Sequence, residues 1–213
     1  STTSRRTIGH GGKYRIALLD FGVKENILRS LASRDCEVTL LPWNTSAEDI
    51  LKLSPDGIFL TNGPGDPTDN VETIETLKTL IPHGIPTMGI CLGHQLLALA
   101  NGFQTEKLKY GHRGANHPVR DLETGRVYIS SQNHGYAVVR NSIDPSIAVE
   151  MYINGNDGTN EGLKYNNAPA FSVQFHPEAC GGPQDTGFLF DRFIFMLKTD
   201  TGKTTGKVPD LSF

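Results

Sequence analysis

The sequence has few cysteines and no long apolar run. Its three cysteines, at positions 36, 91 and 180, lie too far apart for a disulfide scaffold or a paired-cysteine metal clip. No stretch reaches the 18 apolar residues that a membrane-spanning helix needs. The first twelve residues are polar, unlike a secretory signal. These absences favour a cytoplasmic protein in a reducing compartment, with no membrane partner.

An excess of charge of one sign is also missing. The chain has 20 Lys and Arg against 23 Asp and Glu, a net charge of −3. A dedicated nucleic-acid binder usually has a strong basic excess, so no nucleic-acid partner is expected. What the chain does contain, 37% hydrophobic and 20% charged residues over 213 positions, is typical of a globular protein with its own core.

Short apolar runs alternate with helical patterns in the first half of the chain. Buried strands are predicted at 16–19, 38–41, 57–61 and 86–90. Helices are predicted at 23–33, 46–53, 71–81 and 92–100. Alternation with such short connections predicts an α/β fold, in which a mostly parallel central sheet has helices on both faces.

The second half changes character. Turn residues separate strand candidates at 127–130, 137–139, 148–152 and 170–174, and a helix is predicted at 186–198. This pattern predicts an antiparallel or mixed extension of the same sheet. Because no repeat or composition break divides the chain, we expect one domain at 13–198. A flexible lead-in at 1–12 and a polar tail at 199–213 would flank it.

The predicted turn at 89–93, GICLG, has a cysteine at its apex and a glycine two residues away on each side. It matches the nucleophile elbow G-x-S-x-G with sulfur in place of oxygen. We expect strained backbone at the apex, and glycines because a Cβ at either flank would collide with neighbouring chain. Cys91 would begin the 92–100 helix, whose dipole and free N–H groups stabilise a thiolate and an oxyanion. The alternative is a small core side chain.

A thiolate nucleophile needs a base, and the base needs an orienting group. His176 and Glu178 follow the strand at 170–174 two residues apart, so in an extended chain their side chains point to one side. We expect His176 to be the base and Glu178 to hold its ring. His94, one turn into the helix, and His134, in a polar turn, are weaker candidates. The pattern predicts acyl transfer by a Cys–His–Glu triad.

Several motifs resemble the class I (triad-type) glutamine amidotransferase family. They are GICLGHQ at 89–95 and QFHPE at 174–178. Within that family, the chain looks most like the glutaminase domain of carbamoyl-phosphate synthetase. The segments that carry this closer likeness are DFGVKENI at 20–27, NGPGDP at 62–67 and SQNHG at 131–135. The similarity runs from about residue 13 to residue 198.

The resemblance implies that Cys91 attacks the side-chain amide of L-glutamine, which gives a γ-glutamyl thioester and ammonia before water releases glutamate. His176 would act as base and acid in turn, and Glu178 would orient it. The N–H of Leu92, with one from the loop at 63–65, would hold the oxyanion. The implied glutamine contacts are Gly63, Gly65, Leu92, Gln95, Asn133, Gly135 and Tyr136. Tyr136 stands where the family often has Phe.

The resemblance also implies partners. The family's small subunit has an additional N-terminal domain, which adds a serine contact to glutamine, and nothing in this sequence corresponds to it. We therefore expect an excised domain or a naturally short protein. Ammonia released into water would be protonated and lost, so the expected partner is the carbamoyl-phosphate synthetase subunit or region. ATP and Mg would lie on that partner, because this chain has no P-loop, and no metal or cofactor is expected here.

Three alternatives remain open at this stage. The domain could serve another synthetase, such as that for anthranilate, aminodeoxychorismate or GMP. It could be a non-catalytic module that binds glutamine and regulates a partner, although an intact triad argues against that. It could also be a cysteine peptidase or thioesterase on a similar sheet, which would need a large substrate cleft.

Overall fold

The computed structural model describes residues 2–179 and 186–200. Within them, one mixed sheet runs through the molecule in the order β1-β3-β2-β4-β5-β10-β9-β8-β6-β7. Cys180 and most of the predicted tail lie outside the described residues. None of the helices in the described part is both long and apolar enough to span a membrane.

The central half of the sheet is parallel, as predicted. Its strands are β2 (Tyr14–Asp20), β3 (Cys36–Pro42), β4 (Gly57–Leu60), β5 (Thr87–Ile90) and β10 (Ala170–Val173). β2 pairs with β3 and β4, and β5 pairs with β4 and β10, all in parallel. The carboxyl ends of these strands therefore meet at one edge, which is where ligands bind in open α/β sheets.

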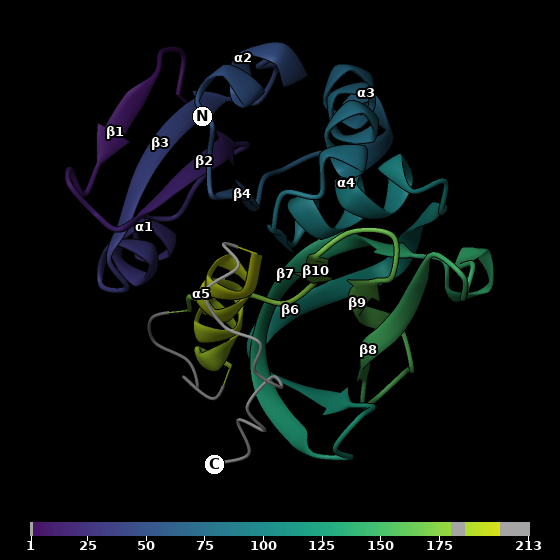
Figure 1. Ribbon diagram of the computed structural model, residues 1–213. Helices are drawn as coiled ribbons and strands as arrows, with labels where there is room; N and C mark the ends of the chain where they lie inside the picture. The colour runs from purple at the N-terminus through teal and green to yellow at the C-terminus, as the bar shows by residue number, and fades with distance from the viewer. Residues whose placement is uncertain (1, 180–185, 201–213) are drawn as a thin grey trace.

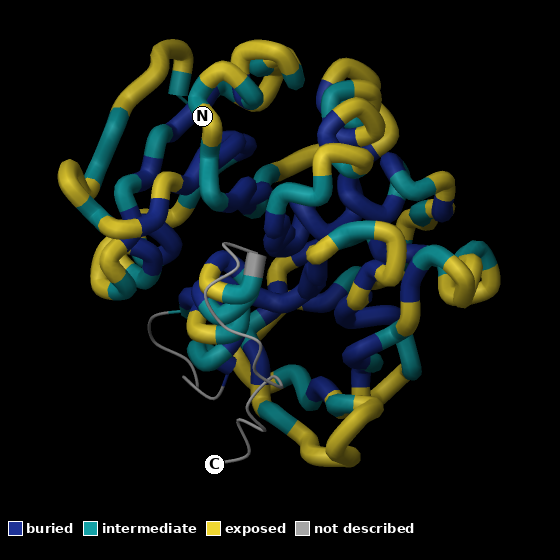
Figure 2. Tube along the Cα trace, in the orientation of Figure 1, coloured by how far each residue is buried: buried dark blue, intermediate teal, exposed yellow. Residues whose placement is uncertain are grey.

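Helices cover both faces of the sheet (Figure 1). They are α1 (Glu25–Ala32), α2 (Ala47–Lys52), α3 (Val71–Leu80), α4 (Leu92–Ala100) and α5 (Phe188–Asp200), with short 3₁₀ turns at Pro67–Asp69, Ile81–His83 and Arg140–Ser142. Alternate strand residues supply the two cores. Leu18 and Phe59 pack with the α1 and α5 side, whereas Leu19 and Leu60 pack with α2, α3 and α4. The central strands are consequently buried on both faces (Figure 2).

The second half extends the sheet with antiparallel strands, also as predicted. They are β6 (Thr105–Asp121), β7 (Val127–Val138), β8 (Ala148–Asn154) and β9 (Asn160–Tyr165). β6 and β7 form a long curved ribbon around one end of the molecule (Figure 1). Two strands predicted at 127–130 and 137–139 are wrong as separate elements, because β7 runs through both. The polar segment 131–135 is strand and not turn, held by pairing with β6.

The lead-in predicted at 1–12 is also corrected. Arg6–Ile8 forms β1, an edge strand antiparallel to β3 with Arg6 opposite Leu40. Only Ile8 packs against the core, so the strand depends on backbone pairing and leaves little apolar signal in the sequence. At the other end, α5 continues through Asp200, two residues into the predicted tail.

Candidate active site

The predicted elbow forms between β5 and α4. Cys91 is the N-cap of α4, with φ 54° and ψ −103°, a region that residues with a Cβ rarely occupy. Its N–H donates to the Val173 carbonyl of β10 at 2.9 Å, and its own carbonyl accepts from the Gln95 N–H at 3.2 Å. The strand before the turn and the helix after it thus hold the strained residue in place.

The flanking glycines are required by close backbone approach. A Cβ on Gly89 would lie 2.7 Å from the carbonyl oxygen of Gly93, and a Cβ on Gly93 would overlap the carbonyl oxygen of Leu60. Both obstacles are main-chain atoms, which cannot rotate away. The expected collision at each glycine is therefore confirmed.

Replacing Gly93 with alanine should lower the free energy of unfolding by about 1–3 kcal/mol or more, because the new methyl group must displace β4 or α4. Urea denaturation measures this loss. Gly135→Ala is the matched control for stability, since Gly135 has no positive φ and the nearest atom to its added Cβ is the end of the Arg113 side chain at 3.8 Å. Equal stability of the two variants would contradict the close contact between α4 and β4.

The fold brings the three predicted catalytic side chains together. His176 and Glu178 follow β10, whose register places Val173 opposite Ile90, one residue before Cys91. Cys91 and His176 line the same pocket, close enough for the thiol to raise the pKa of the imidazole, and His176 Nδ1 lies 2.8 Å from Glu178 Oε1. All three residues are at most 5% exposed, so their charges interact with little screening by water.

The pKa values of His176 and Glu178 move apart. Burial lowers the pKa of His176, but its bonds to Cys91 and Glu178 outweigh burial and raise that pKa to about 9. Burial acts to raise the pKa of Glu178, but the hydrogen bond and charge of His176 and the charge of Lys24 hold it below its ordinary value. The pair therefore consists of an imidazolium and a carboxylate at neutral pH.

Two adjoining pockets open onto Cys91, each about 310 Å³. This volume suits a small molecule of amino-acid size. Six of the seven predicted glutamine contacts line them: Gly63, Gly65, Gln95, Asn133, Gly135 and Tyr136. Leu92, the seventh, has its side chain in the core. Its backbone N–H has no acceptor in the described part of the chain, whereas those of Cys91 and Gly93 bond to Val173 and Thr61.

Comparison with known proteins decides the family. The model of the family "Glutamine amidotransferase class-I" matches residues 17–196, which include the elbow and the His176–Glu178 pair. The chain belongs to the class I glutamine amidotransferases. The carbamoyl phosphate synthase small chain of Bacillus cereus is 55% identical over 188 residues, 88% of this chain and 51% of that protein. The one from Oceanobacillus iheyensis is 53% identical over 98% of this chain and 57% of its own length.

The chain therefore spans about half the length of these curated relatives. The crystal structure of a protein from Thermoplasma acidophilum, described as a putative GMP synthase component, matches with a TM-score of 0.77 at 20% identity, covering 91% of this chain and 98% of that one. This likeness confirms the predicted fold class, a mixed α/β sheet with helices on both faces. The predicted resemblance to class I amidotransferases is confirmed by the family match.

The rival bases occupy other positions in this amidotransferase. His94 is fully buried, its Nδ1 lies 2.8 Å from Ser172 Oγ, and burial lowers its pKa to about 3. It is a neutral packing residue, as its place in the helix suggested. His134 lines both pockets, and burial lowers its pKa to about 4. A group with so low a pKa is a weak base at neutral pH.

Two residues of α1 and the turn before it complete the triad's surroundings, and the sequence analysis assigned them no role. Lys24 Nζ lies 3.1 Å from Glu178 Oε1 and 3.2 Å from His176 Nδ1. Asn26 Nδ2 donates to the Glu178 carbonyl at 3.0 Å. Both belong to the segment DFGVKENI, so the motif was visible but its contact with residues about 150 positions later was not.

Lys24→Met and Glu178→Gln should shift the pH dependence of glutamine hydrolysis in opposite directions. The His176 pKa of about 9 predicts activity that declines as pH rises through that value, since the protonated ring is needed as acid. Removing the neighbouring cation raises the His176 pKa and moves the decline to higher pH. Removing the carboxylate moves it to lower pH. The pH profile of kcat/KM measures both, and shifts of the same sign would contradict this electrostatic arrangement.

Proposed function

We propose that this chain hydrolyses the side-chain amide of L-glutamine to glutamate and ammonia through a thioester on Cys91. The observation that carries the proposal is the buried position of His176 beside the elbow thiol, in the lining of one pocket, with Glu178 bonded to its Nδ1. Membership of the class I amidotransferase family supports the same reaction.

The arrangement supplies each step of acyl transfer. His176, protonated at rest, holds the proton that the thiol has given up, so Cys91 attacks the amide carbon as a thiolate and the ring passes its proton to the departing ammonia. It then accepts a proton from the water that cleaves the thioester. Glu178 keeps the ring oriented and balances its charge. The free N–H of Leu92, with one from the loop at 63–65, stabilises the oxyanion in both tetrahedral intermediates.

Glutamine would occupy the pockets beside Cys91. Asn133, Gly135 and Tyr136 of β7 line them, together with Gly63 and Gly65 of the loop after β4. The Gln95 amide nitrogen is not free to bind glutamine, because Nε2 already donates to the Tyr136 carbonyl and to Gln174 Oε1, both at 2.9 Å. Its part would be to hold the β7 wall.

The proposed recipient of the ammonia is a carbamoyl-phosphate synthetase large chain, which would carry ATP and Mg. Support comes from the two relatives that are more than half identical and are named small chains of carbamoyl phosphate synthase. The part of those relatives that this chain does not span is a second proposed partner region. A cytoplasmic setting is part of the proposal, because a reactive thiolate persists in a reducing compartment.

Glutamine labelled with ¹⁵N in its side-chain amide tests the function and the partner separately. The purified chain should release labelled ammonia. With a carbamoyl-phosphate synthetase large chain, ATP and bicarbonate added, the label should appear in carbamoyl phosphate. Release of label without transfer would refute the partner and favour another synthetase. Binding of glutamine with no release, with or without the large chain, would indicate a regulatory binding module.

A further inference from the structure

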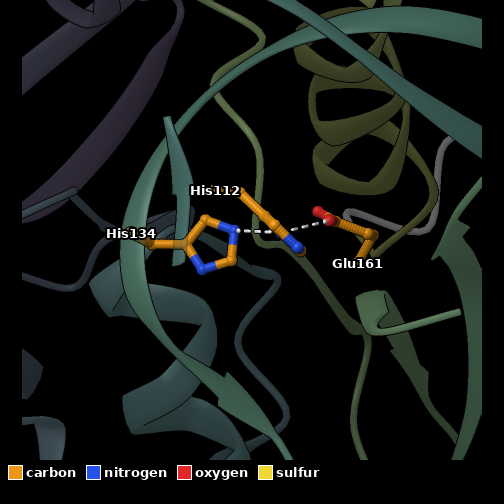
Figure 3. A group of neighbouring side chains, drawn as sticks. All are labelled: His112, His134 and Glu161. Carbon is orange, nitrogen blue, oxygen red and sulfur yellow. Dashed lines mark hydrogen bonds and ion pairs between the residues drawn. The ribbon is translucent and has the colours of Figure 1, made fainter. Parts of the chain in front are cut away.

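A buried polar cluster lies behind the β7 wall of the pocket, and the proposed reaction does not use it (Figure 3). His112 of β6 stands between His134 of β7 and Glu161 of β9. Asp157, in the turn between β8 and β9, contacts His112 from the other side of its ring. Of the four, only His134 lines the pockets beside Cys91.

His112 bonds through both ring nitrogens. Its Nε2 lies 2.8 Å from Asp157 Oδ2, and its Nδ1 lies 3.1 Å from His134 Nε2 and 3.4 Å from Glu161 Oε1. Glu161 is fully buried, and its Oε2 has no partner in the described residues. A buried carboxylate of this kind needs a compensating positive charge. A doubly protonated His112 supplies it and donates from both nitrogens.

His134 can then adopt only one tautomer. Its Nδ1 lies 2.8 Å from the Tyr136 carbonyl, which accepts hydrogen bonds and cannot donate them, so Nδ1 carries the proton. The neutral ring leaves a lone pair on Nε2, and the Nδ1–H of His112 faces it at 3.1 Å. The Gln132 side-chain amide, 3.0 Å from the same Nε2, then presents its NH₂ group to that nitrogen. The Tyr136 carbonyl also accepts from Gln95, which lies one turn after Cys91 in α4.

These bonds form a continuous path from two carboxylates to the substrate wall. Asp157 and Glu161 hold His112, His112 orients His134, and His134 holds the Tyr136 carbonyl. Other groups that face His112 are the His117 ring of the same strand, 5.4 Å away between centroids, and the Asn154 amide of β8. Neither contacts the Tyr136 carbonyl.

We propose that His112 is a positioning residue for glutamine, which acts through His134 to hold Asn133, Gly135 and Tyr136 in the conformation that receives the substrate. The inference rests on the proposed glutaminase function. It assigns His112 an effect on substrate binding and none on the chemistry at Cys91.

His112→Ala should raise KM for glutamine about tenfold, the effect of losing one well-formed hydrogen bond, and leave kcat within about threefold. His112→Asn should recover most of the affinity, because its amide nitrogen can take the place of Nδ1 and donate to His134. His117→Ala is the matched control, since it removes a neighbouring imidazole that has no bond to the wall, and it should leave KM unchanged. Nitrogen NMR should show the Nδ1–H tautomer of His134 in both proteins, because the Tyr136 carbonyl accepts from it in each, and a shift of the Nε2 resonance in His112→Ala, because that atom loses its bond from His112.

An unchanged KM in folded His112→Ala would overturn the proposal. A rise in KM accompanied by an equally large fall in kcat would overturn it as well. If that variant does not fold, Glu161→Gln replaces it, with the same increase in KM expected and an unchanged KM contradicting the inference.

One potential ligand atom from each of His112, His134 and Glu161 lies within 4.8 Å of the other two, a spacing that could hold a metal ion. Stoichiometric zinc in the purified chain, together with a rise in KM on chelation, would show that a metal ion and not the proton of His112 Nδ1 joins these side chains. That result would also overturn the proposal. Wild-type protein without glutaminase activity would refute the proposed function, whereas the NMR measurement still tests the hydrogen bonds.

Discussion

Cys91→Ala should reduce glutamine hydrolysis by a factor of about 10⁴ or more, because removing the nucleophile of a triad leaves only the contribution of binding and the oxyanion site. The elbow should persist, since its shape depends on the glycines and on the bonds of the Cys91 backbone. Initial rates of glutamate release, measured at saturating glutamine, give the loss directly. Glutamine affinity of the variant, measured by calorimetry, should stay near that of the wild type.

Cys36→Ala is the matched control for the loss of a thiol. Cys36 begins β3 in the core, where burial raises its pKa to about 12 and keeps it neutral. Its replacement should leave the turnover of the folded protein unchanged. Retention of more than about 1% of the wild-type rate in Cys91→Ala, far above the residual expected without a nucleophile, would remove Cys91 from the mechanism.

His176→Asn should lower kcat by about 10²–10⁴, the range that a positioned general acid and base contributes. The asparagine side chain keeps much of the volume but can neither accept the thiol proton nor deliver one to ammonia. Steady-state kinetics with glutamine measures the loss, and alkylation of Cys91 by iodoacetamide at neutral pH should slow with it, because the thiolate loses its partner.

His94→Asn separates this account from its closest rival. His94 is also buried and also lies near Cys91 in the fold, but its ring bonds to Ser172 and has a pKa of about 3. Its replacement should reduce stability and leave the turnover of folded protein within about tenfold, well short of the loss of a general base. A greater loss of kcat in His94→Asn than in His176→Asn would exchange the roles of the two imidazoles.

The elements that the sequence predicts well are those in which local pattern and tertiary environment agree. Strands β2, β4 and β5 are buried on both faces over most of their length, so they appear as apolar runs. The elbow is visible because two close backbone approaches demand glycine at fixed positions on either side of Cys91. His176 and Glu178 are visible because they stand two residues apart just after a predicted strand. The structure brings their side chains together in a turn, with the Ala179 N–H donating to the His176 carbonyl at 3.4 Å, and not in the extended segment that the prediction assumed.

The elements that the sequence hides are held by distant partners. β6 is mostly exposed and polar, and β7 contains the segment QNHG, so neither has the alternation of a half-buried strand. The role of Lys24 depends on α1 lying beside the loop after β10, and the role of His112 depends on the pairing of β6 with β7. Such contacts join residues 20 to 150 positions apart, and no local periodicity indicates them.

The most direct test of the central claim is to trap the acyl-enzyme. The protein is mixed with L-glutamine, quenched in acid within the first turnover and digested for mass spectrometry. The account predicts a glutamyl group on the peptide that contains Cys91. Cys91→Ala should lack this group, and a variant that hydrolyses the thioester more slowly should accumulate it. Glutamate formed at the full wild-type rate with no glutamyl group on Cys91 at any quench time, or with the group on another residue, would contradict it.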